Sequence, residues 1–272
     1  MITSTSNNNI KNIVQLNNSS KARREQNAFA AEGVKMFMEA PLPCIKEVYI
    51  SEGLLDKVNI AARYDDKNDE AQLLKKCALK LKETGYTDVS DQVFKKMSDT
   101  LTPQGILTVV MEKRHKLNEL LLSKDRSDIH VLILENLQDP GNLGTIIRTA
   151  EAAGYDFILA NEGTVDMYNP KVIRSTMGSI YRVPVVYSGD LRGDIGRLKA
   201  KGVKVLAAHL KGTRSYREVD AGSRTAVMIG NEGSGLSDET AALADEYVKI
   251  PMKGEVESLN AAVAAALMMY ST

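Results

Sequence analysis

The chain has 272 residues, of which 43% are hydrophobic and 26% charged, with 35 basic and 35 acidic side chains. The length and composition predict one large or two modest globular domains. The equal numbers of basic and acidic side chains exclude a chain-wide positive field that would attract nucleic acid, so affinity for phosphate must come from local clusters. Residues 1–18 lack the basic and apolar regions of a secretion signal, and no run is long enough to cross a bilayer, so we expect a cytoplasmic protein without membrane contact.

The front part of the chain predicts a small α/β unit. Residues 20–40 place Phe29, Gly33 and Phe37 at helical spacing, and we expect one helix there. The elements expected after it are strand 47–50, helix 73–81 stopped by Gly85, helix 91–97 and buried strand 105–111. The predicted boundaries are 1–18 for a polar N-terminal segment, 19–111 for this unit, 112–127 for a charged linker and 128–272 for a second domain.

Apolar strands and helices alternate regularly throughout the second domain. The expected elements are strand 129–134, helix 142–153, strand 156–160, a short helix capped by Asn169 and begun by Pro170, strand 184–187, helix 191–201, strands 203–208, 226–229 and 247–250, and an alanine-rich helix 258–270. Such alternation predicts a parallel sheet with helices on both faces. Ligands of these sheets bind beyond the carboxyl ends of the strands, where loops and helix N-termini gather.

The first loop of unusual composition is 135–144, which ends in Asp-Pro-Gly-Asn-Leu-Gly. Pro140 and Gly141 predict a turn, Asn142 can cap the following helix, and the long side chain of Arg148 can lean back toward the helix start. Local physics alone leaves two interpretations open, a capped helix with a surface arginine or an Asn and an Arg at the mouth of a site.

The second loop reads Gly-Asn-Glu-Gly-Ser-Gly over residues 230–235, directly after an apolar strand. Glycines at a strand exit allow a ligand to approach the backbone or simply make a tight turn. The late position and the spacing disfavour a dinucleotide site, which uses the loop after the first strand. Glu232 is either a polar loop residue or a ligand contact.

The third segment contains Ile250-Pro251-Met252, then Ser258-Leu259-Asn260 and the alanine-rich helix. Ser258 is expected to cap that helix, and its free N–H groups would form a polar mouth. The small side chains of this helix allow close packing, either within the core or against another subunit.

Taken together, the three segments resemble the SpoU/TrmH branch of the SPOUT methyltransferases in residue identity, order and spacing. The matching stretches are 142–148, 229–235 and 250–266, and residues 24–40 and 101–106 are similar to the family's amino-terminal substrate-binding domain. The resemblance implies a carboxyl-terminal SPOUT domain with a parallel sheet and a deep trefoil knot, preceded by a small α/β RNA-binding domain like that of certain ribosomal proteins. This sequence departs at Gly141, where many relatives carry a larger polar residue, and at Glu257, where a smaller one is common.

The same resemblance implies an enzyme that uses S-adenosylmethionine to methylate a ribose 2′-hydroxyl of RNA, and the expected RNA is 23S ribosomal RNA. It also implies a homodimer formed through the knot domain. Its implied catalytic residues are Arg148, Asn142, Glu232, Ser258 and Asn260. Its implied cofactor-binding residues are Ala207, Gly230, Asn231, Ile250, Met252, Ser258 and Leu259. RNA contacts are expected from Arg148 and from the basic cluster Lys21, Arg23 and Arg24, with a second basic cluster at 113–116.

Two alternatives stay open at this point: a transfer-RNA substrate, and an RNA-binding module of the same fold without activity. It is also open whether Arg148 removes the hydroxyl proton or stabilises charge, although an arginine is almost always protonated. Two cysteines and three histidines lack metal-ligand spacing, so no metal is expected.

Overall fold

A computed structural model describes residues 1–64, 68–122 and 127–272. Its contacts divide the chain into two compact units, one of residues 1–113 with 168–181 and the other of residues 114–167 with 182–272. Residues 123–126 of the predicted linker lie outside the described part. Each unit is considered by itself below.

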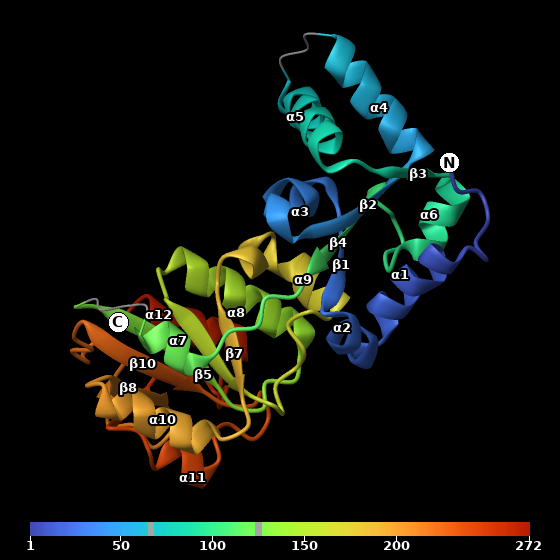
Figure 1. Ribbon diagram of the computed structural model, residues 1–272. Helices are drawn as coiled ribbons and strands as arrows, with labels where there is room; N and C mark the ends of the chain where they lie inside the picture. The colour runs from blue at the N-terminus through green and yellow to red at the C-terminus, as the bar shows by residue number, and fades with distance from the viewer. Residues whose placement is uncertain (65–67, 123–126) are drawn as a thin grey trace. The chain divides into compact units, whose positions relative to one another are not determined.

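The N-terminal unit is built on a four-stranded sheet in the order β1-β4-β2-β3 (Figure 1), in which β2 and β3 are parallel and the other neighbours antiparallel. The strands are β1 Ala28–Glu32, β2 Ile45–Ser51, β3 Thr87–Val89 and β4 Ile106–Met111. The helices before β4 are α1 Asn8–Asn18, α2 Ser20–Gln26, α3 Val34–Glu39, α4 Glu52–Arg63, α5 Asp69–Thr84 and α6 Asp91–Met97, with a short 3-10 turn η1 at Leu42–Cys44. The expected strands at β2 and β4 and the helices at α5 and α6 are confirmed, and Gly85 ends α5 at φ 70°.

The single helix predicted over 20–40 is wrong. Asn27 adopts the left-handed conformation with φ 46° and ends α2, and the chain then runs as strand β1 before α3 begins. Residues 28–31 are all buried. A strand that is covered on both faces reads as a continuous apolar run, and periodicity cannot separate such a run from a helix.

The polar segment predicted at 1–18 contains helix α1. Ile10, Ile13 and Leu16 are fully buried at a spacing of three residues, and they join the core formed with α6, β1 and β4. Three apolar residues on one face are enough to bury a helix whose other positions, apart from Val14, are Asn, Gln and Lys. Helix α4 and strand β3 were likewise not predicted.

A segment from the second half of the chain completes the N-terminal unit. Helix α9 (Pro170–Thr176) and the 3-10 turn η2 (Ser179–Tyr181) follow strand β6 and contact β1. The ring of Phe29 stacks on Tyr168 and Tyr181, with centroids 4.5 and 6.3 Å apart, and Arg174 forms an ion pair with Asp99 at 2.9 Å. No pattern in the sequence indicated this excursion, although the predicted Asn169 cap and Pro170 start of α9 are confirmed.

The second unit contains a seven-stranded, all-parallel sheet in the order β7-β6-β5-β10-β8-β11-β9. Its strands are β5 Ile129–Leu134, β6 Phe157–Asn161, β7 Val185–Ser188, β8 Lys204–Ala208, β9 Arg214–Ser215, β10 Arg224–Ile229 and β11 Glu246–Lys249. Its helices are α7 Leu117–Leu122, α8 Pro140–Ala152, α10 Leu191–Ala200, α11 Asp238–Ala241 and α12 Ala261–Met269. The predicted parallel α/β sheet is confirmed.

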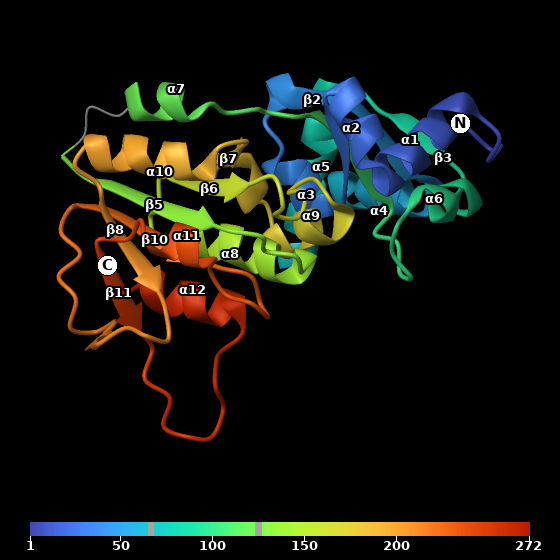
Figure 2. The same ribbon diagram turned by 90° about the horizontal axis from the view of Figure 1, so that it is seen from below.

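Helices cover both faces of this sheet, with α10 on one side and α8 and α12 on the other (Figure 2). One core joins α7 and α10 to the strands, and α12 packs along α8 and β10 on the opposite face. The small side chains of α12 allow this close approach. No helix among the described residues is both long and apolar enough to span a bilayer.

The stacked rings predict that α9 depends on β1. Truncation of Phe29, which is 2% exposed, to Ala should destabilise the N-terminal unit by about 3–5 kcal/mol because a large buried ring is lost. Amide hydrogen exchange over 170–176 should accelerate with it. Leu101→Ala is the control, since Leu101 is 99% exposed and its loss should change stability by less than about 0.5 kcal/mol. Unchanged exchange in α9 after Phe29→Ala would contradict the dependence.

Candidate active site

Three loops meet at the carboxyl edge of the parallel sheet. Strands β5 and β10 are parallel neighbours in which Leu134 lies opposite Ile229, so the loops that follow them start side by side. Strand β11 belongs to the same edge, and the segment after it leads into α12, which packs on α8. Parallel strands therefore bring together the three segments that stood apart in the sequence.

The carboxylate of Glu232 lies at the centre of this junction. Its Oε1 accepts hydrogen bonds from the backbone N–H of Asp139 and from Asn142 Nδ2, both at 3.0 Å, and its Oε2 accepts one from the N–H of Gln138 at 3.1 Å. A longer contact of 3.4 Å comes from Asn231 Nδ2. One side chain of the glycine loop thus fixes the turn that precedes α8.

Asn142 connects Glu232 to the third segment by hydrogen bonds. While its Nδ2 donates to Glu232, its Oδ1 accepts a hydrogen bond from Asn260 Nδ2 at 2.9 Å. The Oδ1 of Asn260 then accepts from the N–H groups of Ala262 and Val263 and caps α12. Glu232, Asn142 and Asn260 form one chain of hydrogen bonds, which we call the carboxylate–amide network.

Two predicted helix caps are wrong, and the network explains why. Helix α8 is capped by Asp139, whose carboxylate accepts the N–H of Asn142 at 2.8 Å, and Asn142 is left to bridge two loops. Helix α12 is capped by Asn260, two residues after the predicted cap, so Ser258 lies in the preceding loop. In both cases two residues of capping type stand close together, and tertiary partners decide between them.

The pKa of Glu232 is lowered below its ordinary value. Burial alone would raise it, but the hydrogen bonds from Asn142 and from the backbone of Asp139 and Gln138 stabilise the charged form by more. Glu232 is therefore ionised across the neutral pH range, and its lone pairs are engaged by donors.

A second carboxylate, which sequence analysis missed, holds the far end of the glycine loop. Glu135 is 7% exposed and accepts hydrogen bonds from the N–H and hydroxyl of Ser237, both at 2.8 Å, and from the hydroxyl of Thr240. Ser237 in turn caps α11. A glutamate directly after an apolar strand, beside the Asp-Pro turn, was the signal available in the sequence.

The glycine loop itself is tight. Asn231 and Gly235 exchange two backbone hydrogen bonds of 3.0 Å, and Asn231 Oδ1 accepts the N–H groups of Gly233 and Ser234. A Cβ on Gly230 would collide with the backbone of Gly235 and Leu236. Glycine is thus required at position 230 because the backbone doubles back on it.

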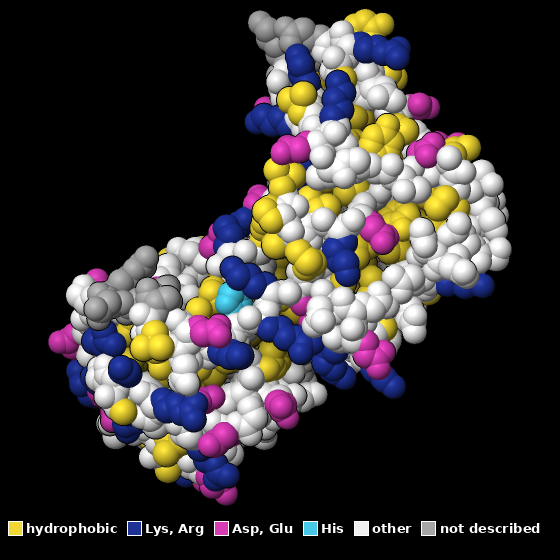
Figure 3. All heavy atoms as spheres, viewed as in Figure 1, with side chains coloured by type: hydrophobic (Ala, Val, Ile, Leu, Met, Phe, Trp, Pro, Cys, Tyr) yellow, Lys and Arg dark blue, Asp and Glu magenta, His cyan; other side chains and the backbone are white. Residues whose placement is uncertain are grey.

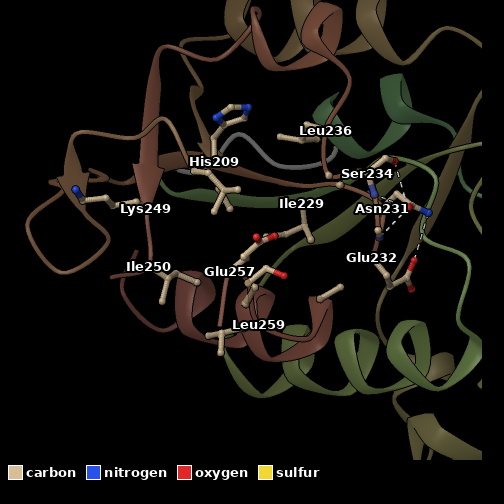
Figure 4. Close-up of a pocket in the computed structure, with 18 of the residues that line it drawn as sticks. His209, Ile229, Asn231, Glu232, Ser234, Leu236, Lys249, Ile250, Glu257 and Leu259 are labelled. Carbon is tan, nitrogen blue, oxygen red and sulfur yellow. Dashed lines mark hydrogen bonds between the residues drawn. The ribbon is translucent and has the colours of Figure 1, made fainter. Parts of the chain in front are cut away.

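A cavity of about 370 Å³ opens beside this loop, within the size range of small-molecule sites (Figure 4). It lies between the carboxyl ends of β8, β10 and β11 and the start of α12. Its lining comprises residues 208–211, 229–236, 248–250, Met252, Glu257, Ser258, Leu259, Ala261 and Ala264.

Most of the predicted cofactor-binding residues line this cavity: Gly230, Asn231, Ile250, Met252, Ser258 and Leu259. Ala207 does not, since it is fully buried in the core of the sheet. The lining begins one residue later, at Ala208, and continues through His209, Leu210 and Lys211, where the ring of His209 stacks on Tyr247 at 4.7 Å. These missed residues follow β8 at the same sheet edge.

The predicted catalytic residues lie in three kinds of surroundings. Asn142, Glu232 and Asn260 are linked by the network, and Ser258 lines the cavity. Arg148 is exposed on α8, six residues after Asn142, and no residue in the described part of the chain bonds its guanidinium. A free guanidinium at this position is available to a ligand.

The predicted RNA contacts in the first unit also differ among themselves. Lys21 is exposed and pairs with Glu25 at 3.8 Å, and Arg24 is exposed. Arg23 is 4% exposed, and its guanidinium donates to the carbonyl oxygens of Leu16 and Asn17 at the end of α1. Arg23 thus stabilises the junction of α1 and α2, which contradicts its assignment as an RNA contact.

Comparison with known proteins gives two family matches. Residues 129–270 match the model of the SpoU rRNA Methylase family, and residues 7–108 match the MRM3-like substrate binding domain. Among the described residues, no group of three or more His, Cys, Asp or Glu side chains is arranged to hold a metal ion.

Individual relatives agree with these matches. The chain is 39% identical over 182 residues to the 23S rRNA (guanosine(2553)-2′-O)-methyltransferase RlmP of Bacillus subtilis, covering 67% of this chain and 70% of that protein. It is 32% identical to an uncharacterized tRNA/rRNA methyltransferase of Synechocystis, covering 99% and 92%. The AdoMet-bound rRNA methyltransferase of Sinorhizobium meliloti has a similar structure, with a TM-score of 0.80 at 29% identity, covering 99% and 95%.

The network predicts a pH-dependent effect of Glu232→Gln. A glutamine cannot accept all of the donors that the carboxylate engages, so the variant should melt at a lower temperature than the wild type at pH 7. Because the folded-state pKa of Glu232 is lowered, its stabilisation is fully present above the unfolded-state pKa of about 4.3 and is lost as the pH falls through the folded value. The gap in melting temperature should therefore close in acid.

The measurement is thermal unfolding of both proteins from pH 7 to pH 3, with Glu255→Gln as the control, since Glu255 is exposed and has no bond to any described residue. A gap that stays constant across this range would show that the charge of Glu232 contributes nothing.

Proposed function

Because the chain belongs to the SpoU rRNA Methylase family, we propose that it transfers a methyl group from S-adenosylmethionine to a ribose 2′-hydroxyl of 23S ribosomal RNA. The observation that carries the proposal is the carboxylate–amide network, which joins the three family segments beside one cavity. Membership and the AdoMet-bound neighbour establish an S-adenosylmethionine-dependent RNA methyltransferase. The ribosomal substrate rests on the relatives.

The cavity fits the cofactor in size and chemistry. Residues 208–211, 230–236 and 248–250 line it, and the side chains of Ile229, Ile250 and Leu259 offer apolar walls for an adenine ring. We assign its binding to Gly230, Asn231, Ile250, Met252, Ser258 and Leu259. When bound, S-adenosylmethionine supplies an electrophilic methyl group on a sulfonium.

The residues around the cavity would act mainly by positioning. Methyl transfer requires the ribose oxygen in line with the carbon–sulfur bond, and near-attack placement of this kind accounts for much of an enzymatic rate. Asn142 and Asn260 are held by Glu232 and fix the starts of α8 and α12. Glu232 is a positioning residue, because its oxygens accept donors from the chain itself and are poor proton acceptors.

Arg148 is the residue we assign to the substrate. Its guanidinium is free of partners in the described part of the chain and carries a positive charge, so it can hold a phosphate and stabilise charge that develops on the ribose oxygen. Electrostatic stabilisation is thus the chemistry that the arginine offers.

The N-terminal unit supports a structured RNA as substrate. Residues 7–108 match a substrate binding domain, and Lys21 and Arg24 are the candidate phosphate contacts of this unit. The basic stretch 113–116, which leads into the second unit, is a further candidate. Basic and acidic side chains are interspersed on the face in Figure 3, so no single-sign field dominates there. A few basic side chains at fixed positions can orient the enzyme on one defined RNA site. A ribosomal RNA substrate would also place the enzyme in the cytoplasm.

A trefoil knot and a homodimer complete the proposal. The knot rests on the family resemblance. Chain segments near the cavity do pack closely, since Gly212 has no room for a Cβ against the backbone of Val248 and Lys249. The dimer is supported by apolar side chains left exposed on and beside α12, Val263 at 48% and Tyr270 at 67%. Sedimentation equilibrium tests the dimer: Val263→Arg should yield monomers, and a wild-type monomer would refute it.

The proposed function is tested by mapping 2′-O-methyl groups in ribosomal and transfer RNA from cells with and without the gene. We expect one ribose of 23S rRNA to lose its methyl group, and purified protein with S-adenosylmethionine to restore it. Loss confined to a transfer RNA would replace the substrate, and no change in any RNA would refute the activity.

The role of Arg148 predicts separate effects on binding and transfer. Arg148→Ala should leave the affinity for S-adenosylmethionine nearly unchanged and lower the rate of methyl transfer by about 10²–10³-fold, the usual cost of losing one charge-stabilising donor. Arg197→Ala is the control, since Arg197 is exposed and pairs with Asp194. Calorimetry and single-turnover transfer measure the two effects, and near-normal turnover of Arg148→Ala would remove this residue from the mechanism.

A further inference from the structure

Two carboxylates line the cavity, and their surroundings differ. The oxygens of Glu232 are engaged by the backbone at 138–139 and by Asn142, and its side chain lies at the side of the cavity (Figure 4). Glu257 comes from the loop before α12, and no residue in the described part of the chain bonds or pairs with it. Its negative charge is therefore open to solvent and to a ligand that enters the cavity.

The side chain of Glu257 points into the cavity. In Figure 4 its carboxylate projects in the direction of Ile229, another residue of the lining, whereas the side chain of Lys249 extends away toward the edge of the view. The neighbouring apolar side chains offer the carboxylate no hydrogen bond. A cationic ligand in this cavity could therefore pair with its charge.

We propose that Glu257 makes this cavity prefer the positively charged methyl donor over its neutral product. The inference rests on the proposed function. S-adenosylmethionine carries a sulfonium cation, and S-adenosylhomocysteine, which remains after transfer, carries a neutral thioether. The adenosine, ammonium and carboxylate groups are common to both, so a carboxylate that faces the sulfur separates them by charge alone.

The other charged groups of the lining do not give this preference. Lys211 and Lys249 would attract the carboxylate that donor and product share, and a contact made equally to both cancels from the ratio of their affinities. Near the sulfur they would oppose the cation. Glu257 is thus the lining residue whose free charge favours the donor.

The size of the effect follows from Coulomb's law. A unit pair about 5 Å apart in water-like surroundings changes affinity by roughly fourfold, and by more as less water separates the charges. Glu257 is exposed, so we expect a change on the order of 3–30-fold that weakens with ionic strength. A preference of this size would help the donor to compete with the product for the cavity.

Calorimetric titration of the full chain tests the proposal with three ligands: S-adenosylmethionine, S-adenosylhomocysteine and sinefungin, whose protonated amine replaces the sulfonium methyl. Glu257→Gln should bind the donor and sinefungin about 3–30-fold more weakly and bind the product as the wild type does. Glu255→Gln is the matched control from the same loop, since Glu255 is exposed and lies outside the cavity lining, and it should change none of the three affinities.

Equal weakening of all three ligands, or no weakening of any, would overturn the proposal. In the wild type, salt should weaken donor binding more than product binding, and equal salt dependence would overturn it even if the variant failed to fold. Failure of the proposed function looks different, because the wild type would then bind neither donor nor product. A normal affinity ratio with slower transfer and a lost acidic limb in the pH–rate profile would instead make Glu257 a proton acceptor.

Discussion

The site depends on one constraint, that a single ionised carboxylate accepts hydrogen bonds from separate parts of the chain. Glu232 leaves the glycine loop after β10 and holds both the backbone before α8 and the side chain of Asn142. Asn142 holds Asn260, and Asn260 caps α12. Charged hydrogen bonds of this kind are stronger than neutral ones, so the relative positions of two helix starts and one loop follow from one side chain.

The sheet makes this arrangement possible. Strands β5, β10, β8 and β11 are adjacent and parallel, so the loops after them emerge at the same edge although they are far apart in the sequence. The glycines then allow close approach where side chains would collide, as at Gly230. The backbone forms the cavity, and the network fixes the residues beside it.

Much of the second domain was predictable, because its apolar strands and its capping and turn residues are local signals. Local signals could not decide which of two capping residues caps α8, since Asp139 and Asn142 are equally suitable and Glu232, about ninety residues away, captures Asn142. Because local signals do not report tertiary contacts, they also did not predict strand β1, which is buried on both faces, or the packing of α9 on β1. Arg23 looked like a phosphate contact because burial cannot be read from charge.

Charge alone therefore does not assign a role to a residue in this protein; the hydrogen-bonding groups around it do. The guanidinium of Arg23 donates hydrogen bonds to carbonyl groups at the end of α1, whereas that of Arg148 has no partner in the described part of the chain. Glu232 and Glu257 differ in the same way, since one carboxylate is saturated by the chain and the other is not. A charged side chain whose hydrogen bonds are all made by the chain stabilises the fold, because fixed dipoles already balance its charge. A charged side chain at the cavity without such partners can interact with a bound ligand. This difference separates the positioning groups from those that face substrate and cofactor.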